Sequence, residues 1–265
     1  MFGMFKNLWR YRGFVASSIA NEFSVRFARS KLGGLWMVIH PLTQVAIYAL
    51  ILSNVLSAKL PGIENKYAYA IYLVAGMLGW SLFTEIVSKC LTLFTDQGNL
   101  MKKMIFPRIT LPAIAVGSSL VNNFFLFIAV MLVLVFLGNF PSGEILWLVP
   151  LYGLLVSLAV GVGLIFGVLN VFVRDVGQVV PIFLQLLFWF TPIVYPVKVI
   201  PEELQQVVMM NPLYPIITGF HNILVYHKAP ELDYSMLMLF ACSLGLLILG
   251  LFVFRRAAPE MVDSL

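Results

Sequence analysis

The sequence predicts an all-α integral membrane protein, and two observations carry this prediction. Five stretches of 19 or more residues contain no Asp, Glu, Lys or Arg: 35–57, 113–137, 145–173, 179–197 and 236–254. A transmembrane helix needs about 20 mostly apolar residues to cross roughly 30 Å of hydrocarbon. The composition agrees, because 61% of the residues are hydrophobic and 11% are charged, whereas soluble domains carry about 25% charged residues.

The chain is expected to contain six transmembrane helices, preceded by a helix of a different kind. The stretch 68–87 adds the sixth apolar segment and is interrupted only by Glu85. Residues 1–34 place apolar side chains at helical spacing and charged side chains on other faces, which predicts an amphipathic helix at the membrane surface. They show no signal-peptide pattern. In the fourth span, Gly163 and Gly167 predict a close helix contact.

The distribution of Lys and Arg predicts that both termini lie in the cytoplasm. Of the 17 basic residues, 13 fall in the N-terminal segment, the loops 88–112 and 174–178 and the C-terminal tail, and 4 fall in the opposite loops. Short loops rich in Lys and Arg stay in the cytoplasm. The formal net charge of +5 reflects this bias, so we expect no nucleic-acid partner.

The segment between the fifth and sixth spans is ambiguous by length alone, because 204–227 also lacks Asp, Glu, Lys and Arg. Asn211, Pro212 and Pro215 fall in its middle, where a lipid-exposed helix would leave backbone groups without hydrogen-bond partners. We expect residues 196–230 to form two short helices that dip into the membrane from the outer face, as a candidate gate. A folded extracellular cap is the alternative.

Few residues are suited to catalysis or metal binding. The sequence has no phosphate-binding loop, no H-E-x-x-H or G-x-S-x-G motif and no cluster of histidines. Cys90 and Cys242 lack a partner at metal or redox spacing and are expected to be unreactive. We therefore expect no catalytic residue, no metal and no cofactor in this chain, and another chain would bind any ATP that is used.

Two cytoplasmic segments each allow two interpretations. Arg26, Arg29 and Lys31 lie just before the first span, and they either belong to a simple membrane anchor or flank a lateral entrance for a lipid-linked anionic substrate. The loop 96–108 is basic and contains several apolar residues, which predicts a short amphipathic helix that contacts a partner protein. A solvated turn is the alternative for this loop.

Aromatic residues gather around the fifth span: Phe183, Phe188, Trp189, Phe190 and Tyr195. Ring faces pack against the C–H faces of sugars with little demand on sugar sequence, which suits a sliding polymer. Aromatic residues also fill lipid-facing and interfacial positions in most membrane proteins. The residues by themselves leave both interpretations open.

Several patches of the sequence together resemble a known family. They are Arg29-Ser-Lys-Leu-Gly-Gly-Leu-Trp36, Asn99-Leu-Met-Lys-Lys-Met-Ile-Phe-Pro107-Arg108, Asn170-Val-Phe-Val-Arg174-Asp175-Val-Gly-Gln178, Phe190-Thr-Pro-Ile-Val-Tyr-Pro196 and Asn211-Pro-Leu-Tyr214. In order and spacing they resemble the permease subunit of ABC-2 type polysaccharide exporters, which include O-antigen, capsule and teichoic-acid transporters. The resemblance runs over nearly the whole chain, so residues 1–265 are expected to form one transmembrane domain.

The resemblance implies a transport function in the inner (plasma) membrane of a bacterium. The chain would be a non-catalytic permease that forms a homodimer and works with two copies of a separate ATP-binding subunit. Its substrate would be an undecaprenyl-linked polysaccharide, and its other contacts would be membrane lipids. Arg174 and Asp175 would form a structural ion pair or a helix-end interaction, or would contact the substrate.

The resemblance also implies three groups of site residues. The first and fifth spans would line a canal through Trp36, Tyr48, Phe183, Phe188, Trp189, Phe190 and Tyr195. The segment that contacts the ATPase would comprise Asn99, Leu100, Lys102, Lys103, Phe106 and Pro107. The gate would comprise Asn211, Pro212, Tyr214 and Pro215.

We expect processive movement through this canal, because a polymer much longer than the bilayer does not fit a closed midplane pocket. Two other functions stay open. An ABC-2 exporter of small hydrophobic compounds or lipids would need a lateral exit but no continuous aromatic canal. An intramembrane enzyme of lipid-linked sugar metabolism would need two or more acidic or His residues in register, which this chain does not show.

Overall fold

Four long apolar helices form the main body of the molecule. The computed structural model describes residues 2–28, 30–47, 68–103, 107–140, 142–231 and 233–264, which form helices and turns and no strand. The helices long and apolar enough to cross a membrane are α5 (Ala68–Asp96), α7 (Thr110–Phe136), α8 (Leu148–Phe172, extended by a 3-10 turn at Gly143–Trp147) and α12 (Tyr234–Ser264). They confirm the prediction of an all-α integral membrane protein, and they match the second, third, fourth and sixth predicted spans.

The helices at the first and fifth predicted spans are shorter. α3 (Trp36–Ile47) covers the first part of the stretch 35–57, and the rest lies outside the described residues. α9 (Val176–Trp189) has 14 residues and is about 21 Å long, which is less than the roughly 30 Å of hydrocarbon. The expectation of a helix through residue 197 is wrong beyond Trp189. Pro192 lies three residues after Trp189 and Pro196 lies seven residues after it, and proline lacks the N–H that a helix needs and disfavours helix in the preceding residue.

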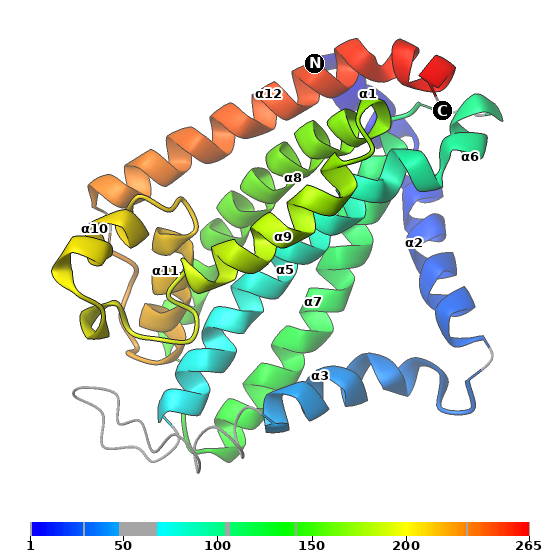
Figure 1. The fold of residues 1–265 in the computed structure, drawn as a ribbon. Coiled ribbons are helices and arrows are strands. Elements are labelled where there is room, and N and C mark those ends of the chain that lie inside the picture. Colours follow the sequence, from blue (N-terminus) through cyan, green and yellow to red (C-terminus); the bar gives the residue numbers. More distant parts are fainter. Residues whose placement is uncertain are drawn as a thin grey trace.

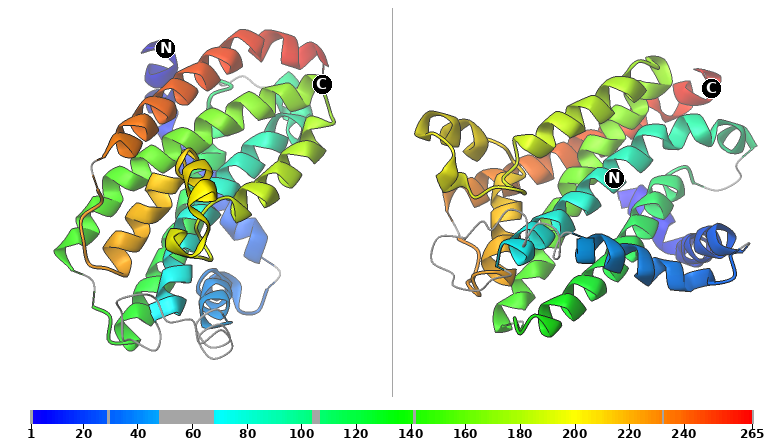
Figure 2. Two further views of the ribbon diagram at one scale, coloured as in Figure 1. Left: turned by 60° about the vertical axis from the view of Figure 1, so that its left-hand side comes forward. Right: turned by 60° about the horizontal axis from the view of Figure 1, so that its bottom comes forward.

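The N-terminal segment forms two helices where a single one was expected. α1 (Phe2–Arg10) and α2 (Arg12–Phe27) are separated at Tyr11. α2 packs against α7, and a Cβ atom added to Gly117 would lie 2.4 Å from Cδ1 of Ile19. α3 also packs against α7, so α2 and α3 lie together on one side of the bundle (Figures 1 and 2).

The core is built around α8, which packs against both α5 and α12. A Cβ atom added to Gly167 would lie 2.3 Å from the carbonyl oxygen of Cys90, and one added to Gly163 would lie 2.8 Å from the Cys90 Cβ. The close contact predicted at this glycine pair is therefore confirmed. Across the other face of α8, Gly161 meets α12, and a Cβ atom added to Gly250 would lie 2.7 Å from the Gly161 carbonyl oxygen.

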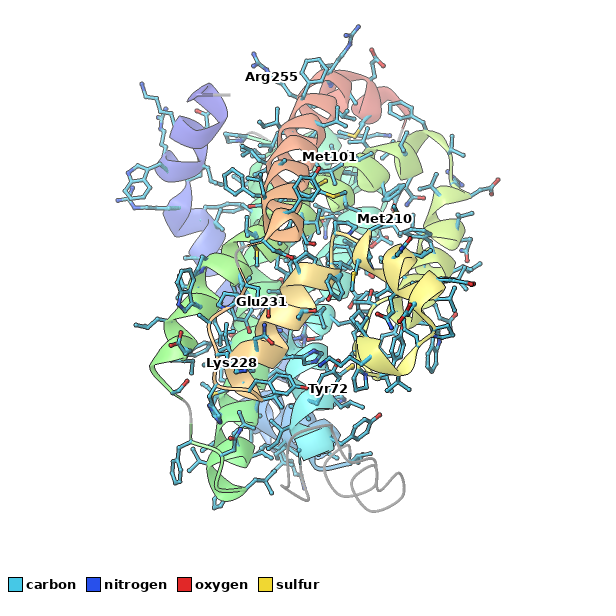
Figure 3. The ribbon with its side chains drawn as sticks, turned by 90° about the vertical axis from the view of Figure 1, so that its left-hand side faces the viewer. Tyr72, Met101, Met210, Lys228, Glu231 and Arg255 are labelled. Atoms are coloured by element: carbon cyan, nitrogen blue, oxygen red, sulfur yellow. The ribbon has the colours of Figure 1, made fainter. Side chains whose placement is uncertain are left out.

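The two ends of the bundle carry different elements. The chain termini and α6 (Gly98–Lys103) lie at one end, and α10 (Glu202–Met209) and α11 (Tyr214–Leu224) lie toward the other (Figures 1 and 2). In Figure 3, Met101 and Arg255 are found near the first end and Tyr72 and Lys228 near the second. The position of both termini at one end is what an even number of spans requires.

Candidate functional site

A groove between α5 and α9 contains two of the aromatic side chains that the sequence singled out. Its volume is about 480 Å³. Its lining combines aromatic, hydroxyl and amide side chains with two aliphatic ones: Trp80, Thr84, Ser88, Pro181, Leu184, Gln185, Phe188 and Trp189. Trp80, Thr84 and Ser88 follow one another at intervals of four residues on α5, so they share one face of that helix. We call this site the aromatic groove.

α9 buries one face and leaves the opposite face exposed. Val180 and Leu184 are buried, whereas Phe183, Trp189 and the following Phe190 are each more than half exposed. Phe188 packs edge-on against Trp80 with 5.5 Å between the ring centroids. Phe188 and Trp189 therefore line the aromatic groove, while Phe183 and Phe190 lie on the exposed surface outside it.

The remaining predicted canal residues do not line this groove. The Trp36 indole N–H donates to Ser30 Oγ at 3.0 Å, and its helix, α3, packs against α7 instead of α9. The Tyr195 hydroxyl donates to the Trp189 carbonyl oxygen at 2.5 Å and so caps the turn after α9. Tyr48 lies outside the described residues. Within one chain, the described part of the first predicted span is thus not assembled beside α9.

The turn after α9 is held by tyrosines of α5. The Tyr69 hydroxyl donates to the Val194 carbonyl oxygen at 2.7 Å. The Tyr72 hydroxyl lies 3.1 Å from the carbonyl oxygens of both Pro192 and Tyr195. Non-helical backbone in apolar surroundings needs such donors, because an unpaired buried carbonyl group is costly.

Asn211 holds the turn between α10 and α11 against the same segment. Its Nδ2 donates to Thr191 Oγ1 at 2.8 Å and to the Phe190 carbonyl oxygen at 3.3 Å, and its Oδ1 accepts the Leu213 N–H at 3.0 Å. Of the other predicted gate residues, Pro215 is buried and Pro212 and Tyr214 are half-buried. Burial raises the pKa of the Tyr214 phenol. The two short helices expected in 196–230 are present, and the chain turns between them at residues 210–213.

α11 lies close against α5 at a contact that sequence reasoning did not find. The rings of His221 and Tyr72 are stacked with 3.6 Å between their centroids. A Cβ atom added to Gly76 would lie 2.9 Å from His221 Nε2, so the absence of a side chain at Gly76 allows this approach. The signal available in the sequence was a histidine in an otherwise apolar segment.

A set of charged and polar side chains joins α2, α5 and α7. Lys89 Nζ lies 3.1 Å from Glu85 Oε1 and 3.4 Å from Glu22 Oε1, and it donates to Ser118 Oγ at 2.7 Å. The Glu85 carboxylate also accepts a hydrogen bond from Asn122 Nδ2 at 3.0 Å. Glu22 in turn pairs with Arg26 at 3.1 Å. We call these residues the ionic network: Glu22, Arg26, Glu85, Lys89, Ser118 and Asn122.

One of the three predicted entrance residues, Arg26, belongs to the ionic network. Arg26 is paired within α2 and also lies over the Phe23 ring, whereas Lys31 is exposed and Arg29 lies outside the described residues. The sequence drew attention to Glu85, but not to Lys89 one helical turn later. Ionisable residues within apolar helices are usually paired, so that spacing was the signal for a network.

The short helix in the loop 96–108 was predicted and is observed as α6. Met101 is buried in a cluster with Phe94 of α5 and Phe254 of α12, and Lys102 is exposed. α6 also carries Asn99, Leu100 and Lys103, Pro107 is half-buried, and Phe106 lies outside the described residues. The Arg108 guanidinium donates to the Ala258 carbonyl oxygen, so the segment that follows α6 is fastened to α12.

Arg174 and Asp175 lie in the turn between α8 and α9, and both are exposed. Among the described ion pairs none joins these two side chains. The turn is held instead by Asn170, whose Nδ2 donates to the Leu91 carbonyl oxygen at 2.9 Å. A Cβ atom added to Gly177 would lie 2.8 Å from Asn170 Oδ1, which explains the small residue there.

Comparison with known proteins identifies the family that this chain matches. Residues 15–225 match the ABC-2 type transporter family. The O-antigen export system permease protein RfbA of Myxococcus xanthus is 26% identical over 268 residues, which cover 100% of both chains. A protein of the same name from Klebsiella pneumoniae is 30% identical over 92% of both chains. The polysialic acid transport protein KpsM of Escherichia coli is 26% identical over 94% of this chain and 95% of its own. The matched residues include the aromatic groove, the ionic network, α6 and the turn at Asn211.

Proposed function

Because the chain belongs to the ABC-2 type transporter family, we propose that it is the membrane permease of an exporter for a lipid-linked, O-antigen-like polysaccharide. It is a multi-pass membrane protein of the inner membrane, and its relatives are permeases named for O-antigen export and for polysialic acid transport. The lining of the aromatic groove is the observation that supports a carbohydrate substrate.

The lining of the aromatic groove suits a sugar better than a hydrocarbon. Trp189, which is 60% exposed, and the half-buried Phe188 offer apolar ring surfaces, against which the C–H faces of a sugar ring pack, whereas Trp80 is buried behind Phe188. Thr84, Ser88 and Gln185 lie beside them and offer groups that exchange hydrogen bonds with hydroxyls. No charged side chain is found among the described residues that line this groove, so its contacts are weak and similar to one another, which favours processive sliding of a polymer.

ATP is bound by a separate subunit in this proposal, since ABC-2 permeases of polysaccharide exporters work with an ATP-binding subunit. Residues 99–107 make contact with that subunit, because α6 lies at the end that holds both chain termini and exposes Lys102. The fastening of Arg108 to the Ala258 carbonyl then passes movement of α6 to α12.

A homodimer completes the canal. One chain leaves Phe183, Trp189 and Phe190 of the α9 region exposed, and it places Trp36 of α3 away from them. Two copies that meet along α9 and α3 bring these residues together around one path, with one ATP-binding subunit for each copy. The α10–α11 pair acts as the outer gate, hinged where Asn211 contacts Thr191. Lys31 and Arg29 flank the entrance for the phosphate of the lipid carrier.

The test is the location of the surface polymer in a strain that lacks the gene, probed with a polymer-specific antibody on intact and on permeabilised cells. We expect polymer trapped inside these cells, and polymer restored to the surface by the intact gene but not by a version that lacks residues 99–107. Normal surface polymer in the deletion strain would contradict a polysaccharide substrate and favour an exporter of small hydrophobic compounds or lipids.

The aromatic groove is tested in the same strain with Trp189→Ala. A contact between two aromatic rings is worth about 0.5–1.5 kcal/mol, and for a ring–sugar contact of similar strength we expect export to fall by about twofold to tenfold. Trp147→Ala is the matched control, because Trp147 is also exposed but lies outside the groove. Equal export by both variants would show that Trp189 is only a packing residue.

A further inference from the structure

A second groove lies between α7 and α12 and has α8 as its floor. Its volume is about 430 Å³, and every residue that lines it is apolar. Ala113 and Val116 belong to its α7 wall, Val160 to its floor and Leu251 to its α12 wall, and Leu8 of α1 lies over it. We call it the aliphatic groove. No side chain in its lining offers a hydrogen bond, so its occupant is a hydrocarbon.

The aliphatic groove runs along the membrane-length helices at the end that holds the chain termini. It is lined by the first turns of α7, from Pro112 to Leu120, and by the later part of α12, at Leu247 and Leu251. α1 lies near this end of α12 (Figures 1 and 3). The loop charges place this end in the cytoplasm, so the groove lies at the depth of the inner leaflet.

Basic residues stand at the cytoplasmic end of the groove. Leu247, Leu251 and Arg255 follow at intervals of four residues on α12, so Arg255 continues the groove wall one turn toward the membrane surface. Figure 3 shows Arg255 at the end of α12 that lies beside α1. Arg108 directly precedes the lining residue Ile109, and its guanidinium is held on the Ala258 carbonyl. The first acidic residue of the chain is Glu22, so α1 adds only positive charge.

We propose that the aliphatic groove binds one acyl chain of an anionic phospholipid of the cytoplasmic leaflet, with its phosphate next to Arg255 and Arg108. A lipid tail is equally apolar in the bilayer and in the groove, so moving it into the groove improves its packing but adds little hydrophobic stabilisation. The selectivity therefore comes from the headgroup, because basic residues at the membrane surface attract anionic lipid. This lipid is a resident of the transporter, and its site opens between α7 and α12, on helix faces other than those of the aromatic groove.

The experiment is native mass spectrometry of the purified permease–ATPase complex, titrated with palmitoyl-oleoyl phosphatidylglycerol or palmitoyl-oleoyl phosphatidylcholine. We expect phosphatidylglycerol to bind in preference. Arg255→Gln is expected to reduce this preference about fivefold, since one surface charge contributes about that factor. Arg256→Gln is the matched control, because it removes the same charge from the next position, about 100° around the helix. Equal loss in both variants would overturn the proposed headgroup site.

The tail site is tested separately by filling it. Ala113→Phe places a ring in the groove and is expected to lower the occupancy of phosphatidylglycerol about tenfold, whereas Ala241→Phe, on the exposed face of α12, leaves it unchanged. Both variants are compared after gel filtration shows an intact complex. Unchanged occupancy in Ala113→Phe would overturn the proposal. Displacement of the phospholipid by undecaprenyl phosphate would also overturn it, because the groove would then belong to the exported substrate.

Discussion

The two grooves of this chain are similar in volume, about 480 and about 430 Å³, but their chemistry is opposite. The aromatic groove presents the exposed Trp189 beside hydroxyl and amide groups, and the described lining of the aliphatic groove contains no polar side chain. An average hydropathy gives no hint of this contrast, because both grooves are lined by helices that are strongly apolar overall. The difference teaches that the substrate class has to be inferred from individual helix faces and not from the composition of a span.

The ionic network shares α5 with the aromatic groove and α7 with the aliphatic groove. On α5, Thr84 and Ser88 line the aromatic groove, while the adjacent Glu85 and Lys89 point toward α2 and α7. On α7, Ser118 joins the ionic network, and the nearby Gly117 and Leu120 line the aliphatic groove. We therefore expect a change in the network to affect both grooves.

The largest effect is expected from Gly161→Leu, which breaks the aliphatic groove but leaves the aromatic groove alone. A Cβ atom at Gly161 would lie 2.5 Å from the Leu246 backbone, so α12 has to move away from α8. Overpacking of this kind costs about 3 kcal/mol, and we expect a lower melting temperature of the purified complex and loss of bound phospholipid. Gly153→Leu is the matched control, because nothing lies within 4 Å of its added Cβ. Equal melting temperatures would show that this helix contact adapts.

A smaller effect is expected from Lys89→Met, which tests whether the two grooves are coupled. The change removes the cation that Glu85 and Glu22 share, at a cost of about 2 kcal/mol, because the partly buried Glu85 carboxylate then keeps, among its described contacts, only the hydrogen bond from Asn122. We expect lower thermal stability together with reduced export and reduced lipid occupancy. Adding Glu85→Gln to the variant should recover part of the stability, because the unpaired charge is removed. An effect on one groove alone would contradict the coupling.

The smallest effect is expected from Ser88→Ala, which sharpens the chemical contrast. Ser88 is exposed in the aromatic groove, and loss of one hydrogen bond to a sugar hydroxyl costs about 1 kcal/mol. We expect export to fall about fivefold, with unchanged lipid occupancy. Ser157→Ala on α8 serves as the control, since its hydroxyl donates to the Gly153 carbonyl at 2.7 Å and Ser157 lines neither groove. No difference in export between the two variants would mean that the hydroxyl at position 88 does not contact the substrate.

The sequence predicted the features that depend on local composition. Uncharged stretches located α7, α8 and α12, an apolar stretch interrupted by Glu85 located α5, and the Asn-Pro sequence at Asn211 located the break between α10 and α11. The glycine pair at Gly163 and Gly167 predicted a close helix contact, since the absence of a side chain is itself a local property.

The features that depend on distant partners were not predicted. The end of α9 at Trp189 is stabilised by Tyr69 and Tyr72 of α5, which lie more than 100 positions earlier in the chain. The pairing of Lys89 with Glu22 joins α5 to α2, and the pattern of apolar residues along the sequence does not show that these two helices lie close together. Both grooves arise between helices, so their linings were visible only once the helices were placed.

The length of α5 has a mechanical consequence. Tyr72 and Asp96 belong to one uninterrupted helix and are about 36 Å apart along its axis. Because a hydrogen-bonded helix is stiff along its axis, a displacement at the Asp96 end of α5, which a single turn residue joins to α6, would also displace the tyrosine hydroxyls at the other end. A movement of α5 along its axis would therefore pull directly on the carbonyl groups of residues 192, 194 and 195, because the Tyr69 and Tyr72 hydroxyls are hydrogen-bonded to them.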